Sequence, residues 1–246
     1  MSLNFIFPNW PAPTNVKALQ TTRIGGVSQA PYDSFNLGEH VKDNAMHVAQ
    51  NRQMLSQFLP SEPVWLNQIH GIEVVDAANT TCVPNADASF TTHKNVVCVT
   101  MTADCLPVLL CDQAGTVVAS IHAGWRSLCD GVIEATVKQM PAESNQLMAW
   151  LGPAIDPNAF EVGSDVRDQF IAQDAQAHLA FVKSNDKYLS NKYYGNLYKI
   201  ATQRLNKLGV LQVYGGDRCT YTEKDHFFSF RRDGDTGRMA SLIWLS

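Results

Sequence analysis

Three widely spaced side chains, His70, Cys105 and His122, carry the strongest chemical signal in this sequence. Each lies at or near the end of a short apolar run typical of a buried strand, and strand ends that open into loops are common places for chemistry. Two imidazoles and one thiolate form a ligand set for zinc that leaves a fourth tetrahedral position for water. Zinc polarises such a water into a nucleophile near neutral pH. The pattern therefore indicates a catalytic metal site assembled from different strands.

The same residues allow two other interpretations. Cys105 could be the nucleophile of a hydrolase, with one of the histidines as its base. All three could instead be structural, because a free cysteine often behaves as a small buried hydrophobe. Asp104, beside Cys105, is a candidate acid or base, or a group that orients a metal ligand. Residue types and spacing alone leave these alternatives open.

Arginines near glycine-containing turns indicate an anion site. Arg126 directly precedes a helix expected to start near Ser127, and helix N-termini bind phosphate through free N–H groups and the helix dipole. Gly124 would permit close approach. Arg23 and Arg218 are further candidates, since a guanidinium matches phosphate oxygens bidentately. Each arginine could equally form a surface ion pair.

The elements that must position these residues follow from the spacing of apolar and turn residues. Strands are expected at 64–69, 96–102, 108–111 and 116–121, with a closing hairpin of 227–230 and 239–245. Helical spacing covers 44–59, 127–140 and 196–208. Asp43 or Asn44 is a natural N-cap for the first helix, and Gly209 a C-terminal stop for the third. These patterns predict an α/β or α+β fold.

Composition limits the class of protein. The 246 residues are 45% hydrophobic, contain no internal repeat or linker, and fit one compact domain spanning 1–246. A net charge of -4 without a basic block gives no electrostatic support for a nucleic-acid partner. No apolar run approaches the roughly 20 residues of a membrane span, and the first residues lack the features of a signal peptide. We therefore expect a cytoplasmic protein with small-molecule partners and no membrane partner.

Six cysteines are present, and none forms a CxxC pair. Several lie in apolar runs, where they are expected to be small buried hydrophobes. Reduced thiols are expected in the absence of an export signal. The five cysteines outside the candidate site, whose roles the sequence does not define, are Cys82, Cys98, Cys111, Cys129 and Cys219.

Seven motifs occur in a fixed order from Thr21 to the C-terminus. They are TTRIGGVS, FNLG, NQIHG, TADCLP, IHAGWR, GPAI and TGR. This ordered set resembles the bacterial laccase-domain family, also named polyphenol oxidases and now regarded as purine nucleoside phosphorylases. The resemblance implies a single, usually monomeric domain with α/β/β/α layers and mixed β-sheets, of the cytotoxic-necrotising-factor-like cysteine hydrolase type.

The resemblance also implies a function. It implies a zinc ion held by His70, Cys105 and His122, phosphorolysis of adenosine, inosine and methylthioadenosine, and hydrolytic deamination of adenosine. In phosphorolysis, phosphate attacks C1′ of the ribose while the purine leaves. Arg126 and Arg23 would then hold phosphate. Gln68 and Asn36 are candidate sugar or base contacts.

Copper-dependent laccase activity, cysteine hydrolysis through Cys105, and metal-stabilised binding without catalysis are the alternatives. The chain has seven histidines and no His-x-His pair, so the four-copper set of a conventional multicopper oxidase is not expected. A single nitrogen and sulfur site could still bind copper, because copper outranks zinc in intrinsic affinity. Weak oxidase activity would then reflect misloaded metal.

Overall fold

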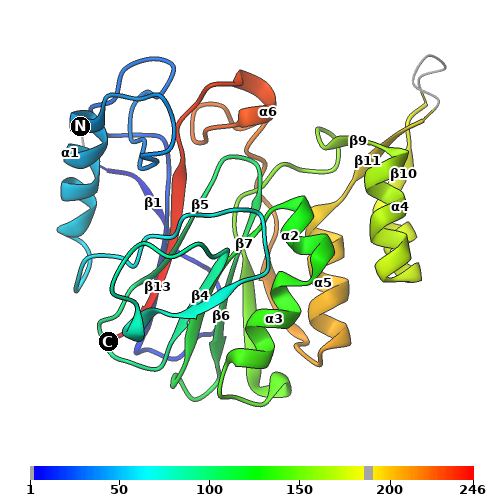
Figure 1. Ribbon diagram of the computed structural model, residues 1–246, viewed down its shortest axis with the longest axis horizontal. Coiled ribbons are helices and arrows are strands. Elements are labelled where there is room, and N and C mark those ends of the chain that lie inside the picture. Colours follow the sequence, from blue (N-terminus) through cyan, green and yellow to red (C-terminus); the bar gives the residue numbers. More distant parts are fainter. Residues whose placement is uncertain (1–2, 186–190) are drawn as a thin grey trace.

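A four-stranded antiparallel sheet and a six-stranded mixed sheet, packed face to face, form the centre of the computed structural model, which describes residues 3–185 and 191–246. Helix α1 (Ala45–Ser56) covers the outer face of one sheet, and α2 (Trp125–Asp130), α3 (Val132–Gln139) and α5 (Leu197–Lys207) cover the outer face of the other (Figure 1). This arrangement confirms the predicted α/β/β/α layers and mixed sheets.

The four-stranded sheet joins segments from both ends of the chain. Its antiparallel strands follow the order β1 (Phe5–Ile6), β2 (Val16–Thr21), β13 (Met239–Leu245) and β5 (Cys98–Thr102). The Asn44 side chain caps α1 by accepting from the Met46 N–H at 2.9 Å, as the sequence predicts. Leu55 of α1 then packs with Leu19 and Leu242 of the sheet.

The three central strands of the six-stranded sheet are buried on both faces. The order of this sheet is β12 (Gln212–Gly215), β8 (Leu147–Leu151), β6 (Leu106–Asp112), β7 (Val118–Ala123), β4 (Ala88–Thr91) and β3 (Val74–Asp76), with parallel pairs at the two edges. Every residue of β6, β7 and β8 is buried, which explains their nearly continuous apolar sequences.

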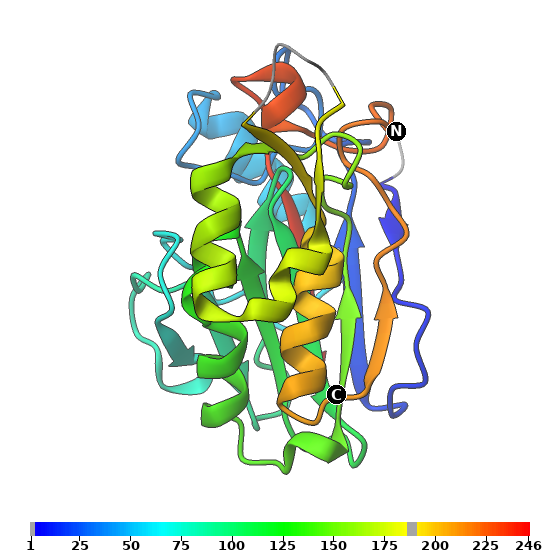
Figure 2. The same ribbon diagram turned by 90° about the vertical axis from the view of Figure 1, so that its right-hand side faces the viewer.

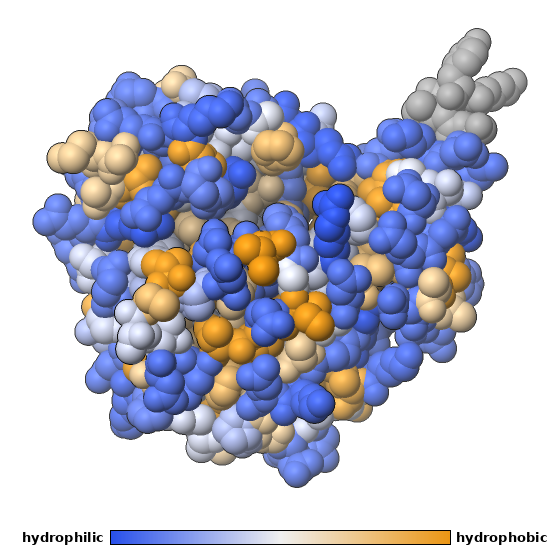
Figure 3. Space-filling view, in the orientation of Figure 1, coloured by the Kyte–Doolittle hydropathy of each residue, from blue (hydrophilic) through white to orange (hydrophobic). Residues whose placement is uncertain are grey.

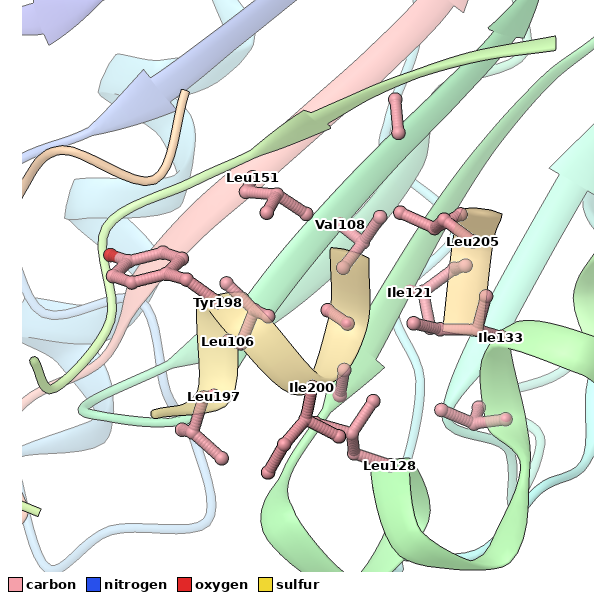
Figure 4. Close-up of a cluster of buried hydrophobic side chains, with 14 of the residues drawn as sticks. Leu106, Val108, Ile121, Leu128, Ile133, Leu151, Leu197, Tyr198, Ile200 and Leu205 are labelled. Atoms are coloured by element: carbon pink, nitrogen blue, oxygen red, sulfur yellow. The ribbon is translucent and has the colours of Figure 1, made fainter. Parts of the chain in front are cut away.

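Alternate residues of β6 serve the two core layers. Val108 faces the helices, whereas Leu109 faces the four-stranded sheet. On the helical side, Val108 and Ile121 meet Ile133 of α3 and Leu205 of α5 (Figure 4). Seen from that side, α3 and α5 lie in front of the sheet (Figure 2).

A smaller substructure projects from one end of this core (Figure 1). It contains the sheet β10 (Phe181–Lys183), β11 (Lys192–Gly195) and β9 (Glu161–Gly163), together with α4 (Ser164–Gln173). The remaining elements are the one-turn α6 (Phe230–Asp233) and the 3-10 helices η1 (Ala77–Asn79), η2 (Ser144–Gln146) and η3 (Ala175–Ala180).

Hydrophilic residues cover most of the face seen in Figure 3, and apolar residues form small scattered groups. Among the described residues, no helix combines the length and apolar character that a membrane span requires.

Three predicted elements are wrong in detail. The helix expected over 127–140 is split into α2 and α3 at Gly131, whose φ of 102° interrupts the helix. Residues 64–69 form only isolated bridges, not a strand, because Val64 and Asn67 each pair once. No hairpin of 227–230 with 239–245 forms, since β13 pairs with β2 and β5 instead.

Candidate metal centre

His70, Cys105 and His122 converge at one end of the sheets. Cys105 lies in the turn between β5 and β6, His122 is the penultimate residue of β7, and His70 lies in the loop before β3. Their donor atoms all lie within 4.8 Å of one another, and the Cys105 Sγ is 3.9 Å from the His70 Nε2. His122 is buried, Cys105 is partly buried and His70 is exposed, so the trio is accessible from one side.

Asp87, a fully buried carboxylate, fastens two of the three candidate ligands. Its Oδ1 lies 2.7 Å from the His122 Nδ1 and accepts from the His70 N–H at 3.0 Å. Its Oδ2 accepts from the N–H groups of Ile69 and Gly71. The carboxylate makes Nδ1 of His122 the donor and leaves Nε2 free for a metal, which is the usual support of a ligating histidine.

The electrostatics of the trio favour the ligand form of Cys105. Burial opposes ionisation of Cys105, but the facing imidazoles of His122 and His70 lower the pKa of its thiol to about 6. A thiolate is the form of cysteine that binds metals. By contrast, burial raises the pKa values of the Cys98 and Cys111 thiols to about 12.

These pKa differences predict selective alkylation of the metal-free protein. Because the thiolate is the reactive form and predominates above the pKa, modification of Cys105 by iodoacetamide should rise with pH to half its maximum near pH 6. Mass spectrometry of peptides over a pH series measures this, with the exposed Cys82 as an internal reference. Equal labelling of Cys105 and Cys82 at pH 6 would contradict the prediction.

Gly124 directly follows β7 and lies against the trio. A Cβ at this position would lie 2.9 Å from the His70 Cδ2, 3.2 Å from the Cys105 Sγ and 3.3 Å from the His122 Cε1. The sequence suggested that this glycine admits a ligand; in the structure it makes room for the three side chains themselves.

A Gly124→Ala substitution should therefore weaken metal binding, by about tenfold or more, because the added methyl group displaces the donors. Competition with a chromogenic chelator measures the affinity. Gly71→Ala is the matched control, since its Cβ would meet nothing closer than 3.5 Å. Equal affinities in the two variants would disprove the crowding argument.

The donor set fits a single metal ion. It combines a thiolate-prone cysteine, a histidine oriented by a carboxylate and a second histidine on the accessible side. Among the residues that the structure describes, the trio is the one group of three or more His, Cys, Asp or Glu side chains close enough to hold a metal. The described residues therefore contain no second ligand cluster that could hold further copper ions.

Two cavities share His70 and Cys105 of the trio as part of their walls, and His122 lines only the first. The first, of about 280 Å³, is called the cationic compartment, and its distinguishing residues are His40, Gln68, Thr102 and Arg238. The second, of about 300 Å³, is called the aromatic compartment, and its distinguishing residues are Asp104, Trp125, Ile155, Phe160, Leu197 and Arg231. Both are lined by His70, Ala103, Cys105 and Phe230.

Three of the other predicted site residues hold the local backbone. Both oxygens of Asp104 accept hydrogen bonds at 2.6 Å, from the Thr220 hydroxyl and from the N–H of Arg231 at the start of α6. Gln68 lines the cationic compartment, but its amide pairs with the Met101 N–H and carbonyl. Asn36 is fully buried and lines neither compartment; its Oδ1 accepts from the N–H of Arg238.

The three predicted anion-binding arginines line neither compartment. Arg23 pairs with Asp33, and Arg218 pairs with Glu223. Arg126 is exposed, and its guanidinium lies 4.3 Å from the Trp125 ring centre, over a wall of the aromatic compartment. The helix starts at Trp125 rather than near Ser127, so Arg126 lies within its first turn.

Four residues beside the trio were not predicted to have a role there: Asp87, His40, Arg231 and Arg238. Arg238 had a signal, because it belongs to the TGR motif of the family resemblance. Asp87 had none, since it sits in a polar stretch and its partners are distant in the chain.

Residues 17–246 match the protein family described as multi-copper polyphenol oxidoreductase laccase. The chain belongs to this family. The predicted family membership is therefore confirmed. The name describes copper chemistry, whereas the described residues of this laccase-family chain offer one candidate metal cluster.

Similar proteins of known sequence are named purine nucleoside phosphorylases. This laccase-family chain is 54% identical over 243 residues to the purine nucleoside phosphorylase YfiH of Escherichia coli (strain K12), and the match covers 98% of each chain. The crystal structure of a Neisseria meningitidis protein is 51% identical, with a TM-score of 0.94 and 99% of each chain covered. YlmD from Geobacillus stearothermophilus is 26% identical with a TM-score of 0.86, over 100% of this chain and 97% of that one.

Proposed function

We propose that the protein is a zinc-dependent purine nucleoside phosphorylase acting on adenosine, inosine and methylthioadenosine with phosphate. The observation that carries the proposal is the placement of one candidate metal centre between a cationic and an aromatic compartment. Phosphorolysis needs an anion, a purine and an activating centre together. The name of the Escherichia coli relative supports the same reaction.

His70, Cys105 and His122 would hold the zinc ion. When bound, zinc supplies Lewis acidity to oxygen atoms of the reactants. Asp87 keeps the His122 ring oriented and the His70 backbone in place, and Gly124 leaves room for the donors.

The chain's other residues position the reactants in this proposal. The rings of Trp125 and Phe160 offer faces on which a purine can stack. Asp104 anchors the start of α6, which carries Phe230 and Arg231 into the cavity walls. Arg126 supplies positive charge at the rim, whereas the ion pairs of Arg23 and Arg218 leave those residues outside the proposed site.

We propose adenosine deamination as a side activity of the same centre, because a zinc site can activate the water that attacks C6 of the purine. The proposed enzyme works as a cytoplasmic monomer on small molecules, without nucleic-acid or membrane partners.

The proposal is tested by incubating the zinc-loaded protein with adenosine, with and without phosphate, and separating the products by chromatography. Adenine and ribose 1-phosphate formed only with phosphate are the expected result. Inosine formed regardless of phosphate would identify a deaminase instead. Phenol oxidation by the copper-loaded form alone would favour a laccase, and saturable binding without turnover a binding protein.

The cysteine hydrolase alternative makes a separate prediction. Turnover through a nucleophilic Cys105 would persist in chelator-treated protein and would disappear in Cys105→Ala. Under the proposed function, both treatments abolish phosphorolysis.

A further inference from the structure

Arg238 presents available N–H groups to the cationic compartment. Its Nη1 donates to the carbonyls of Thr236 and Gly237 at 2.9 and 3.0 Å. Among the described residues, no carboxylate lies within ion-pair distance of this partly buried guanidinium, and its other N–H groups have no protein acceptor. A cation withdrawn from water without a partner is unfavourable, so this arrangement favours an incoming anion.

A second side chain of the same compartment, Thr102, has an unused hydrogen-bonding atom. The Oγ1 atom of Thr102 is buried without a hydrogen bond, and the residue is 2% exposed. Buried hydroxyl groups are nearly always hydrogen-bonded, so such an exception calls for a ligand or an ordered water. His40 adds an imidazole at the exposed mouth. Burial, followed by the nearby cations Arg238, Arg52 and His122, lowers the pKa of His40 to about 4.

The aromatic compartment contains an acidic side chain beside its arginine, because Asp104 and Arg231 both line it. Nη1 of Arg231 donates to the carbonyls of Ala159 and Glu161, and its guanidinium lies 5.6 Å from the Phe160 ring centre. An anion in that compartment would face the acidic side chain of Asp104 and would lose hydration against apolar walls such as Ile155 and Leu197. The two compartments therefore differ in the ligand that each can hold.

We propose that the cationic compartment is the phosphate subsite and that Arg238 and Thr102 bind the phosphate oxygens, while the aromatic compartment holds the purine. This inference rests on the proposed function and deepens it. It moves the anion site from the exposed Arg126 to a residue immediately before β13. A guanidinium and a hydroxyl are both suited to phosphate, and the former can bind two oxygens.

The placement of the compartments suits a displacement at the sugar. The cationic compartment lies at the ends of β5 and β13 of the four-stranded sheet, whereas the aromatic compartment is bounded by Trp125 of α2 and Leu197 of α5. His70, Cys105 and Phe230 line both compartments and lie where the two meet. A phosphate oxygen forms the new bond to C1′ from one side, and the C1′–N9 bond breaks on the other. Its electron pair leaves with the purine, which takes up a proton from solvent.

Steady-state kinetics of the zinc-loaded enzyme with Arg238→Gln tests the assignment. We expect the KM for phosphate to rise at least tenfold, while the KM for adenosine changes less than about twofold. Thr102→Val, a near-isosteric change, should raise the KM for phosphate by about two- to fivefold. Phe160→Leu is the matched variant in the other compartment and should raise the KM for adenosine instead. An unchanged KM for phosphate in Arg238→Gln would overturn the proposal.

Direct binding of inorganic phosphate separates this inference from the proposed function. Equilibrium dialysis with radiolabelled phosphate, without nucleoside, should show the same loss of affinity in Arg238→Gln as the kinetics. Phosphate binding that Arg238→Gln weakens, in a protein without phosphorolysis, would refute the proposed function and leave the subsite standing. Phosphorolysis with unaltered phosphate binding in the variant would refute the subsite alone.

Discussion

An Asp87→Asn variant is expected to bind zinc about 10- to 100-fold more weakly than the unaltered protein. Asp87 is fully buried, and its two oxygens serve the His122 imidazole and the N–H groups of Ile69, His70 and Gly71. The asparagine amide offers one acceptor oxygen for these four donors. Its NH₂ group, itself a donor, would face the remaining donors and could not accept from them. The His122 ring and the His70 loop then lose the support that brings their donor atoms together.

The same variant should be less stable by about 1–3 kcal/mol, because buried donors left without an acceptor pay their desolvation cost. Urea unfolding of the metal-free protein measures this, and chelator competition measures the zinc affinity. Asp168→Asn serves as the control, since that carboxylate is 63% exposed and pairs only with the neighbouring Arg167. Wild-type zinc affinity in Asp87→Asn would show that the carboxylate does not support the metal site.

Replacement of Cys105 by alanine should reduce activity more than Asp87→Asn does. It removes the one thiolate of the candidate ligand set, so we expect no stoichiometric zinc in the purified variant and at least a thousandfold loss of phosphorolysis. Metal content by mass spectrometry and adenine release by chromatography measure the two effects. Two histidines alone leave an incomplete ligand set for zinc.

Cys82→Ala is the matched control, because Cys82 is an exposed thiol and forms no part of the trio. It should keep its zinc and its activity. Full zinc occupancy in Cys105→Ala would remove Cys105 from the ligand set. Full activity in that variant would separate the reaction from the trio.

The trio could be predicted because its residues interrupt strand patterns at their ends. Asp87 could not, because its four hydrogen-bond partners belong to the His70 loop and to β7, which meet only in the folded chain. Gly124 was correctly seen as a point of close approach, but what approaches it are the side chains of the trio. Contacts between residues that are distant in the sequence form only in the folded chain, so no local sequence pattern predicts them.

Local sequence signals favour a different anion-binding arginine from the one that lies beside the trio. Arg126 precedes a predicted helix, which made it the natural phosphate ligand, yet the structure leaves it exposed on Trp125. Arg238 lies in a stretch predicted as a hairpin turn. Its position beside the trio depends on β13 pairing between β2 and β5, and on Asn36 holding its backbone N–H. Neither contact is local in sequence.

The secondary-structure errors have similar causes. Apolar residues at helical spacing continue across Gly131, because Leu128 of α2 and Ile133 of α3 enter the same core. The break therefore depends on the backbone of one glycine. Phe227 and Phe228 read as a strand but are fully buried outside any strand, where they pack with Met239. Their apolar character reflects burial in the core and not membership of a strand.

A zinc titration of chelator-treated protein, followed by phosphate-dependent adenine release, tests the central claim most directly. The claim is that His70, Cys105 and His122 hold one metal ion on which phosphorolysis depends. We expect no activity in the metal-free protein and a linear recovery that ends at one zinc per chain. Full phosphorolysis by the metal-free protein, or recovery that does not follow zinc occupancy, would contradict it.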